Sequence, residues 1–212
     1  RGGPAGALAG RGFASVGSVG RGGYSVEVYV MNADGSGQLR LTRNTVEDGN
    51  PVWSPDGRRI AFVSDWQVWV MNADGSGQRR LTRTSGARNV APAWSPNGQR
   101  IAFERRVGRQ KYRNTAREYG QCSRCDGRVR FQVYVMNADG SEARKLAQDS
   151  AHPVWSPDGR KIAFQYPIGP RGPGGLGKQS DIYVMNADGS GQRNLTRTRR
   201  VESQPVWSPA QK

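Results

Sequence analysis

The sequence predicts an all-β fold, a β-propeller of four tandem blades with four strands in each blade. The first observation is a ten-residue segment that occurs four times, at 29–38, 69–78, 134–143 and 183–192. The second is its spacing, because the methionines of successive copies are 40, 65 and 49 residues apart. Such a period, interrupted by insertions, is typical of propellers and solenoids. The third is the length of 212 residues, which fits a single β-propeller domain over 1–212.

Each repeat is expected to start with a short strand, strand a, that carries a Pro-x-Trp motif. A tight Ser-Pro-Asp-Gly or Ser-Pro-Asn-Gly turn follows, in which Pro fixes φ and Gly takes the left-handed conformation. Strand b then contains Ile-Ala-Phe, at 60–62, 101–103 and 162–164. The tryptophans of strand a hold one position of the repeat and are expected to pack between blades. They are Trp53, Trp94, Trp155 and Trp207.

Strand c is the apolar run Val-Tyr-Val-Met, or a close variant of it, and Asn-Ala-Asp-Gly turns it into strand d. Strands b and c are apolar at nearly every position, which indicates strands that are covered on both faces. Strand d reads Arg-Arg-Leu-Thr in the second repeat, a polar composition typical of an outer edge. The blades are therefore expected to stack face to face around an axis.

The two ends of the chain leave two alternatives for the first and last blades. A copy of strand a occupies 204–209, with no strand b behind it, while 11–16 align with strand b at 58–63. Pairing of these two segments would close a ring of four blades and remove an exposed sheet edge. Alternatively, 4–10 form a degenerate strand a and the chain is an open propeller fragment. An open array would be expected to associate with other chains.

The joined pattern Pro-x-Trp-Ser-Pro-Asp-Gly-x-x-Ile-Ala-Phe and Val-Tyr-Val-Met-Asn-Ala-Asp-Gly-Ser-Gly-Gln-x-x-Leu-Thr resembles the repeat of TolB-type β-propellers. The resemblance covers nearly the whole chain from residue 11 onward, apart from two insertions. It implies a six-bladed propeller, periplasmic or secreted, that binds protein partners. Similar repeats form the propeller of prolyl oligopeptidase-like enzymes. No signal peptide is visible in this sequence, and no apolar run approaches the roughly 20 residues of a membrane span.

Both long insertions, 105–130 and 166–180, fall between strands b and c. The b–c and d–a loops share one face of a propeller, and loops on a rigid scaffold commonly carry binding sites. The first insertion interleaves basic and tyrosine residues, which suits an anionic partner; a mobile, solvated loop would have the same composition. The predicted partner-binding residues are Asp65, Trp66, Arg105, Arg106, Arg109, Lys111, Tyr112, Arg113, Arg117, Tyr119 and Arg124.

We therefore expect a non-catalytic binding or scaffold module that presents its b–c and d–a loops to a protein partner. The chain has no Gly-x-Ser-x-Gly motif and a single histidine, so neither an enzyme nor a cofactor is predicted. One alternative is a polyanion binder, because the net charge of +15 would attract nucleic acid or acidic glycan to 105–130. A second alternative is the accessory propeller of a hydrolase or lyase.

No metal site is predicted either. Cys122 and Cys125 form a Cys-x-x-Cys pair, but the chain has no other cysteine and a zinc site normally needs four ligands. A local disulfide or two free thiols fit the pair better. The turn at 32–37 resembles the first half of a calcium loop, yet it lacks the acidic residue at the twelfth position. A hairpin turn explains it.

Overall fold

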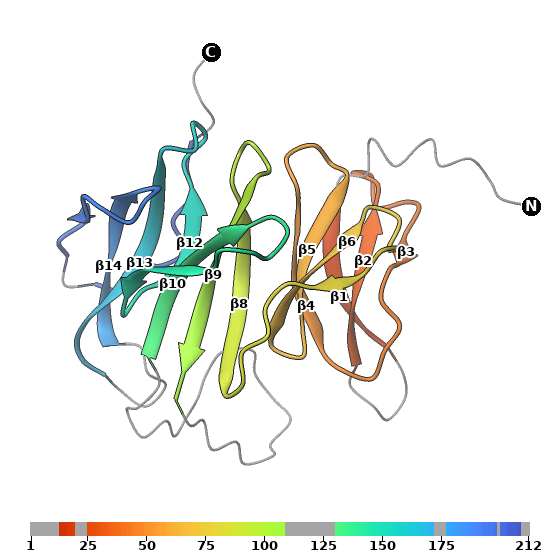
Figure 1. Cartoon of the computed structure of the whole chain (residues 1–212), viewed down its shortest axis with the longest axis horizontal. Coiled ribbons are helices and arrows are strands. Elements are labelled where there is room, and N and C mark those ends of the chain that lie inside the picture. Colours follow the sequence, from red (N-terminus) through yellow and green to blue (C-terminus); the bar gives the residue numbers. More distant parts are fainter. Residues whose placement is uncertain (1–12, 20–24, 109–129, 172–176, 199, 209–212) are drawn as a thin grey trace, which may run out of the picture.

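The computed structural model describes residues 13–19, 25–108, 130–171, 177–198 and 200–208. These residues form four antiparallel sheets that follow one another along the long axis of the molecule (Figure 1). The described residues contain no helix that could cross a membrane. The predicted all-β, four-bladed architecture is confirmed, and each sheet is called a blade below.

The strands follow the predicted a–b–c–d order in blades 2 to 4, and blade 1 contains strands b, c and d among the described residues. Blade 1 consists of β1 (Phe13–Val19), β2 (Ser25–Met31) and β3 (Leu39–Arg40), and blade 2 of β4 (Asp48–Trp53), β5 (Arg59–Ser64), β6 (Gln67–Asn72) and β7 (Arg79–Arg80). Blade 3 consists of β8 (Ala87–Trp94), β9 (Arg100–Val107), β10 (Arg130–Asn137) and β11 (Arg144–Gln148). Blade 4 consists of β12 (Ala151–Trp155), β13 (Lys161–Arg171), β14 (Gly177–Asn186) and β15 (Arg193–Asn194).

The closed ring of four blades is wrong, because the described residues form an open array of four sheets. Among the described residues β1 pairs only with β2, so blade 1 has three strands there instead of four. The C-terminal segment lies against blade 4, where Trp207 Nε1 donates to the carbonyl oxygen of Val154 at 3.2 Å. Residues 4–10, the alternative first strand, lie outside the described residues.

Both insertions also differ from the prediction. Residues 105–107 and 130 belong to the long strands β9 and β10, and only the part between them lies outside the described residues. The second insertion continues the β13–β14 hairpin instead of forming a loop, since Tyr166 pairs with Asp181 and Ile168 with Gln179.

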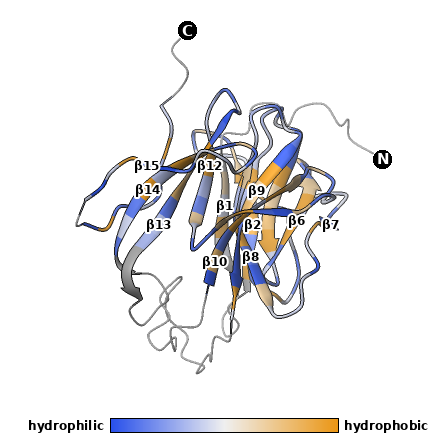
Figure 2. Ribbon diagram, turned by 60° about the vertical axis from the view of Figure 1, so that its left-hand side comes forward, coloured by the Kyte–Doolittle hydropathy of each residue, from blue (hydrophilic) through white to orange (hydrophobic). Residues whose placement is uncertain are grey.

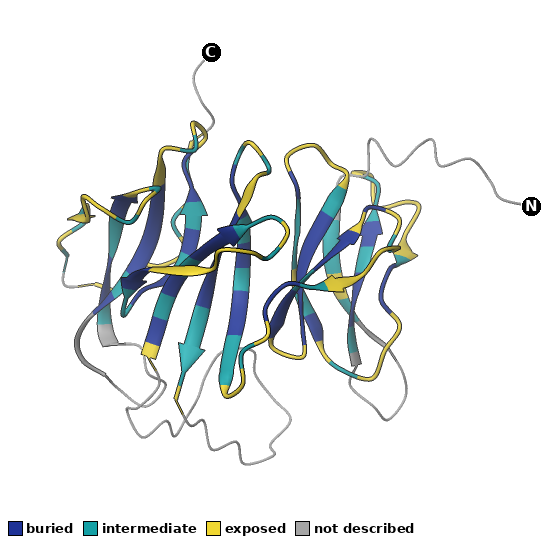
Figure 3. Cartoon of the chain, viewed as in Figure 1, coloured by how far each residue is buried: buried dark blue, intermediate teal, exposed yellow. Residues whose placement is uncertain are grey.

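The core lies between successive blades, as doubly covered strands require. Phe62, Phe103 and Phe164 of strand b are fully buried, and the middle strands carry the hydrophobic and buried residues in Figures 2 and 3. Three clusters fill the junctions between blades 1 and 2, 2 and 3, and 3 and 4. Trp94 and Trp155 belong to these clusters, which confirms their predicted packing between blades.

Strand a contains a bulge that the sequence pattern did not indicate. In each repeat the residue before the proline of strand a has a positive φ, between 48° and 51°. These residues are Asn50, Ala91, His152 and Gln204. In β4, β8 and β12 the pairing register shifts at this point. Two residues of strand a therefore oppose one of strand b, which bends the inner strand.

A hydroxyl group on or after the outer strand accepts an equivalent backbone hydrogen bond in every blade. In blade 2 the backbone N–H of Val68 donates to Thr82 Oγ1 at 2.9 Å, and this hydroxyl donates to Gln67 Oε1 at 2.9 Å. Thr42 and Thr196 accept the same bond in blades 1 and 4. Blade 3 has Ala147 at this position, and Ser150 supplies the hydroxyl instead. The bond extends a two-residue ladder and fixes the edge of the blade.

Replacing Thr82 with valine should lower the free energy of unfolding by about 1–3 kcal/mol, because a buried N–H and a buried amide oxygen would each lose a partner. Valine preserves the shape of threonine, so the loss reports the hydroxyl. Urea denaturation followed by circular dichroism measures it. The exposed Thr45→Val substitution is the matched control, and equal losses for both variants would contradict the role of the hydroxyl.

Candidate interaction surface

Four of the predicted binding residues lie on one face of the array, the face that the turns between strands b and c form. Asp65 and Trp66 form the β5–β6 turn, and Arg105 and Arg106 lie near the end of β9; β9 ends and β10 begins at the lower edge of Figure 1. The other seven lie outside the described residues, as do Cys122 and Cys125. They are Arg109, Lys111, Tyr112, Arg113, Arg117, Tyr119 and Arg124.

The turn of blade 2 holds two residues in an unusual backbone conformation. Ser64 pairs with Gln67 across the turn, and the φ angles of Asp65 and Trp66 are 46° and 57°. Two-residue hairpins favour positive φ at both positions, where Asn-Gly is the preferred sequence. A large aromatic residue in the left-handed region is strained. Trp66 is nevertheless held there with 37 % of its surface exposed.

Blade 3 fixes this turn in place. The backbone N–H of Asn89 donates to the carbonyl oxygen of Trp66 at 2.8 Å. The side chain of Asn89 donates to Gln67 Oε1 at 2.9 Å, inside blade 2. The guanidinium carbon of Arg88 lies 3.9 Å from the centre of the Trp66 ring, a close cation–π contact. The exposed tryptophan is thus part of a rigid junction between two blades.

Two further arginines extend the surface along β9. Arg105 lies over the Tyr134 ring at 3.9 Å, and its Nε donates to Asn89 Oδ1 at 2.9 Å. Arg106 forms an ion pair with the fully buried Glu104 and lies 5.3 Å from the centre of the Phe131 ring. Adjacent residues of a strand point to opposite faces, so these arginines lie on the two sides of blade 3.

Glu104 of β9 links blade 3 to blade 4. Its Oε2 accepts a hydrogen bond from the backbone N–H of His152 at 3.2 Å, beside the bulge of strand a. His152 Nδ1 in turn lies 3.1 Å from Gln165 Oε1. The single histidine therefore takes part in the junction between blades 3 and 4.

The sequence analysis missed Arg88 and Glu104. Arg88 aligns across strands with Arg106, and two like charges at such a pair are unfavourable unless each is compensated. Arg88 lies on Trp66, and Arg106 lies beside Glu104. The available signal for Arg88 was its place four positions before the proline of strand a. The chain has many other arginines, and this place alone did not distinguish Arg88 from them.

The opposite face of the array, which the a–b turns form, has two shallow hollows between neighbouring turns of the described blades. The larger, of about 520 Å³, lies between blades 3 and 4 and is lined by Pro96, Arg100, Trp155 and Asp158. In this turn Ser156 Oγ donates to Asp158, and this hydrogen bond and that of the Arg160 N–H lower the pKa of Asp158. Serine and aspartate are thus engaged in holding the turn itself.

The c–d turns resemble calcium loops in sequence only. Asp34 Oδ1 accepts hydrogen bonds from the hydroxyl and the N–H of Ser36, at 2.7 Å and 2.9 Å. These two bonds lower the pKa of Asp34 below its usual value. Asp188 makes the same bonds with Ser190. In the described part of the chain no group of three or more His, Cys, Asp or Glu side chains could hold a metal ion.

The TolB beta propeller domain family matches residues 14–119. The Tol-Pal system protein TolB of Blochmanniella pennsylvanica is 42% identical over 41 residues, which are 19% of this chain and 9% of that protein. The repeat is therefore related in sequence to one short part of that relative.

Several solved structures share the fold. The putative TolB from Agrobacterium tumefaciens superposes with a TM-score of 0.64 and 23% identity, over 92% of this chain and 66% of that one. TolB from Acinetobacter baumannii gives 0.60 and 17%, over 82% and 39%. A puromycin-hydrolyzing peptidase from Mycobacterium tuberculosis gives 0.63 and 16%, over 92% and 34%. The chain thus spans less than two thirds of each relative.

Proposed function

The chain belongs to the TolB beta propeller domain family, and from this premise we propose that it is a non-catalytic binding module. In this proposal a protein partner docks on the face of the array that carries the b–c and d–a loops. The observation that carries it is the pair of Trp66 and Arg88, an exposed ring and a stacked guanidinium group held at a junction of two blades.

The chemistry of this pair specifies the partner. Tryptophan and arginine are the side chains most enriched among residues that dominate protein–protein binding energy. The guanidinium carbon of Arg88 lies 3.9 Å from the centre of the Trp66 ring, which places a positive charge beside an exposed aromatic surface and favours an acidic partner. A protein segment with an apolar residue beside an Asp or Glu fits this surface best.

The strain in the turn supports a binding role for Trp66. A residue held in the left-handed region destabilises a hairpin unless it is glycine or asparagine, and such strain is concentrated at functional sites. Trp66 is only partly buried, so part of the strained aromatic side chain remains accessible to a partner. The name of the matched relative, a Tol-Pal system protein, also favours assembly with other proteins. A periplasmic or secreted location is part of the same proposal.

Peptide selection on the purified chain tests this function. A random peptide library displayed on phage is panned against the wild type, and the enriched peptides are synthesised with a fluorescent label. We expect acidic peptides with an apolar residue, whose fluorescence anisotropy shows binding that is lost in Trp66→Ala and Arg88→Ala. Arg58→Ala, an exposed arginine in the a–b turn of blade 2, is the control and should bind normally.

Two outcomes would contradict the proposal. One is enrichment of peptides that bind wild type and Trp66→Ala equally well. The other is failure to enrich peptides while labelled heparin or single-stranded oligonucleotide binds with a steep dependence on salt. The latter would favour the polyanion alternative, because release of counterions makes such binding weaken strongly as salt increases.

Replacing Trp66 with glycine should weaken binding of the selected peptides at least about tenfold, which corresponds to roughly 1.4 kcal/mol. The same substitution should lower the free energy of unfolding by less than about 2 kcal/mol, because relief of the left-handed strain offsets part of the packing that the half-buried ring loses. Anisotropy and urea denaturation measure the two quantities. A loss of stability larger than about 2 kcal/mol, on the scale of a buried core residue, would instead assign Trp66 to the core.

A further inference from the structure

Successive blades are joined by a contact that recurs at every junction. A leucine of strand d packs into the c–d turn of the following blade, beside a glycine that has no room for a side chain. A Cβ atom placed on Gly75, Gly140 or Gly189 would lie 3.0–3.2 Å from the preceding leucine. These leucines, Leu41, Leu81 and Leu146, are 7–9 % exposed.

The two ends of the array carry the unmatched halves of this contact. Leu195 holds the same position in blade 4 and is 48 % exposed. Gly35 holds the glycine position in blade 1, and a Cβ atom placed there would meet nothing within 4 Å. One end therefore presents the leucine without its turn, and the other end presents the turn without its leucine.

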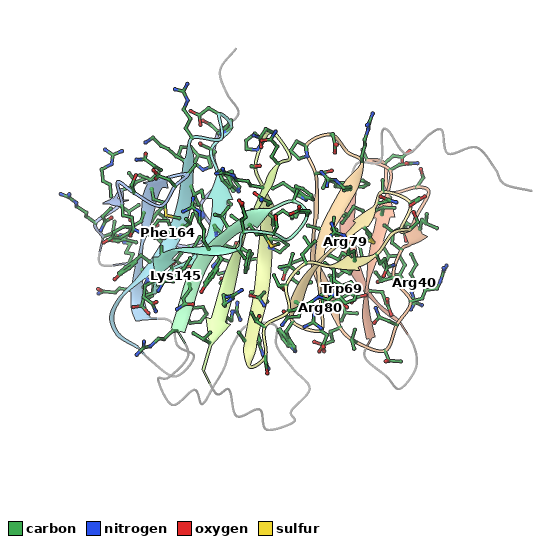
Figure 4. All side chains as sticks on the ribbon, in the orientation of Figure 1. Arg40, Trp69, Arg79, Arg80, Lys145 and Phe164 are labelled. Atoms are coloured by element: carbon green, nitrogen blue, oxygen red, sulfur yellow. The ribbon has the colours of Figure 1, made fainter. Side chains whose placement is uncertain are left out.

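Polar groups repeat the same complementarity. Arg79, which Figure 4 labels, donates from Nη1 to the carbonyl oxygen of Asp139 at 2.7 Å. Arg144 Nη1 donates to the carbonyl oxygen of Asp188 at 3.0 Å. Arg193 holds the equivalent position in blade 4, and Asp34 holds the acceptor position in blade 1. Both residues are exposed.

A glutamine makes a return bond across the junctions of blades 1 and 2 and of blades 3 and 4. Gln78 Nε2 donates to the carbonyl oxygen of Leu41 at 3.2 Å, and Gln192 Nε2 to that of Leu146 at 3.3 Å. Gln38 of blade 1 is the equivalent donor, and it faces no preceding leucine in the described part of the chain. The carbonyl group of Leu195 is the matching acceptor.

The C-terminal segment supplies a strand for the same junction. In blades 2 to 4 the Trp of strand a lies opposite the Ile of strand b, as Trp53 does opposite Ile60. The same register would place Trp207 opposite Phe13 of β1. Val206 is 88 % exposed, and β1 is paired on one side only among the described residues.

We propose that blade 4 of one copy packs on blade 1 of a second copy, head to tail. Leu195 then enters the turn at Gly35, and residues 205–207 become strand a of the partner's first blade. The two faces lie at opposite ends of the array in Figure 1, so they do not meet within one chain. The interface is heterologous and yields a ring if the rotation closes, or a chain of copies if it does not.

Light scattering coupled to size-exclusion chromatography tests the proposal with the full chain. The wild type is expected at twice its mass of 23.2 kDa or more. Leu195→Asp blocks the blade 4 face, and Gly35→Asn blocks the blade 1 face with a residue that tolerates a positive φ. Each variant alone should be monomeric, with the dissociation constant raised about ten- to a hundredfold. Circular dichroism verifies that each variant is folded.

Mixing the two variants distinguishes this interface from any other. The Leu195→Asp copy retains an intact blade 1 face, and the Gly35→Asn copy retains an intact blade 4 face, so the mixture should form a dimer. Controls are Leu39→Asp, with a leucine 38 % exposed, and Gly86→Asn, at a glycine with equal open space; both should associate as the wild type does. A monomeric wild type, variants that still associate, or a mixture that remains monomeric would overturn the proposal.

Discussion

Phe103→Ala is expected to lower the free energy of unfolding by about 3–5 kcal/mol, the cost of truncating a fully buried aromatic ring. Phe103 is 0 % exposed and lies in the cluster between blades 2 and 3. Its ring centre is 5.6 Å from that of Tyr134, so the substitution also removes an aromatic pair. Blades on both sides restrain the site, and the cavity cannot collapse easily. Urea denaturation followed by circular dichroism measures the loss.

Val16→Ala is the control for this prediction, because Val16 lies on β1 of the end blade and is 42 % exposed. It should change the free energy of unfolding by less than about 0.5 kcal/mol. If Phe103→Ala cost as little as Val16→Ala, the middle strands would not be covered on both faces, and the stacked-blade architecture would be wrong.

Arg106→Ala should cost about 3–5 kcal/mol, because it leaves the carboxylate of Glu104 buried without its partner. The side chain of Glu104 is fully buried, and that of Arg106 is 22 % exposed. The substitution also removes the arginine from the Phe131 ring. Denaturation in urea at neutral pH is the measurement, with the exposed Arg58→Ala as the control.

The double variant Glu104→Gln with Arg106→Ala separates charge from packing. Gln165 holds the equivalent position in blade 4 and is also buried, so the site accepts an amide. The double variant should recover most of the stability that Arg106→Ala loses, because no buried charge is left unpaired. Equal losses for the single and double variants would show that Arg106 acts through its contacts with Phe131 alone.

The arrangement of strands could be predicted because each strand carries its own signal. Runs such as Ile60–Phe62 are apolar at every position, and only a strand with a neighbour on each face buries all of them. The turns between strands are equally local, since their Pro and Gly residues set φ directly. Trp66 could be proposed as exposed because it is the one tryptophan outside the repeat positions.

Closure of the array could not be predicted from the same signals. Whether residues 204–209 reach β1 depends on the rotation between successive blades, a quantity that accumulates over the whole chain. The bulges before the prolines were missed because Asn50, Ala91 and Gln204 have no common side-chain chemistry. The contacts of Arg88 and Glu104 bring separate blades together, and local composition does not reveal such pairs.

Each cluster of the core joins only two neighbouring sheets, and this limits how stability is shared. Among the described residues, the core of a blade is covered by the sheet before it and the sheet after it. Cooperativity is consequently relayed from one neighbour to the next, as in linear repeat proteins. In a single dissociated copy we expect opening to begin at blades 1 and 4, which have one such neighbour each, and to reach blades 2 and 3 last.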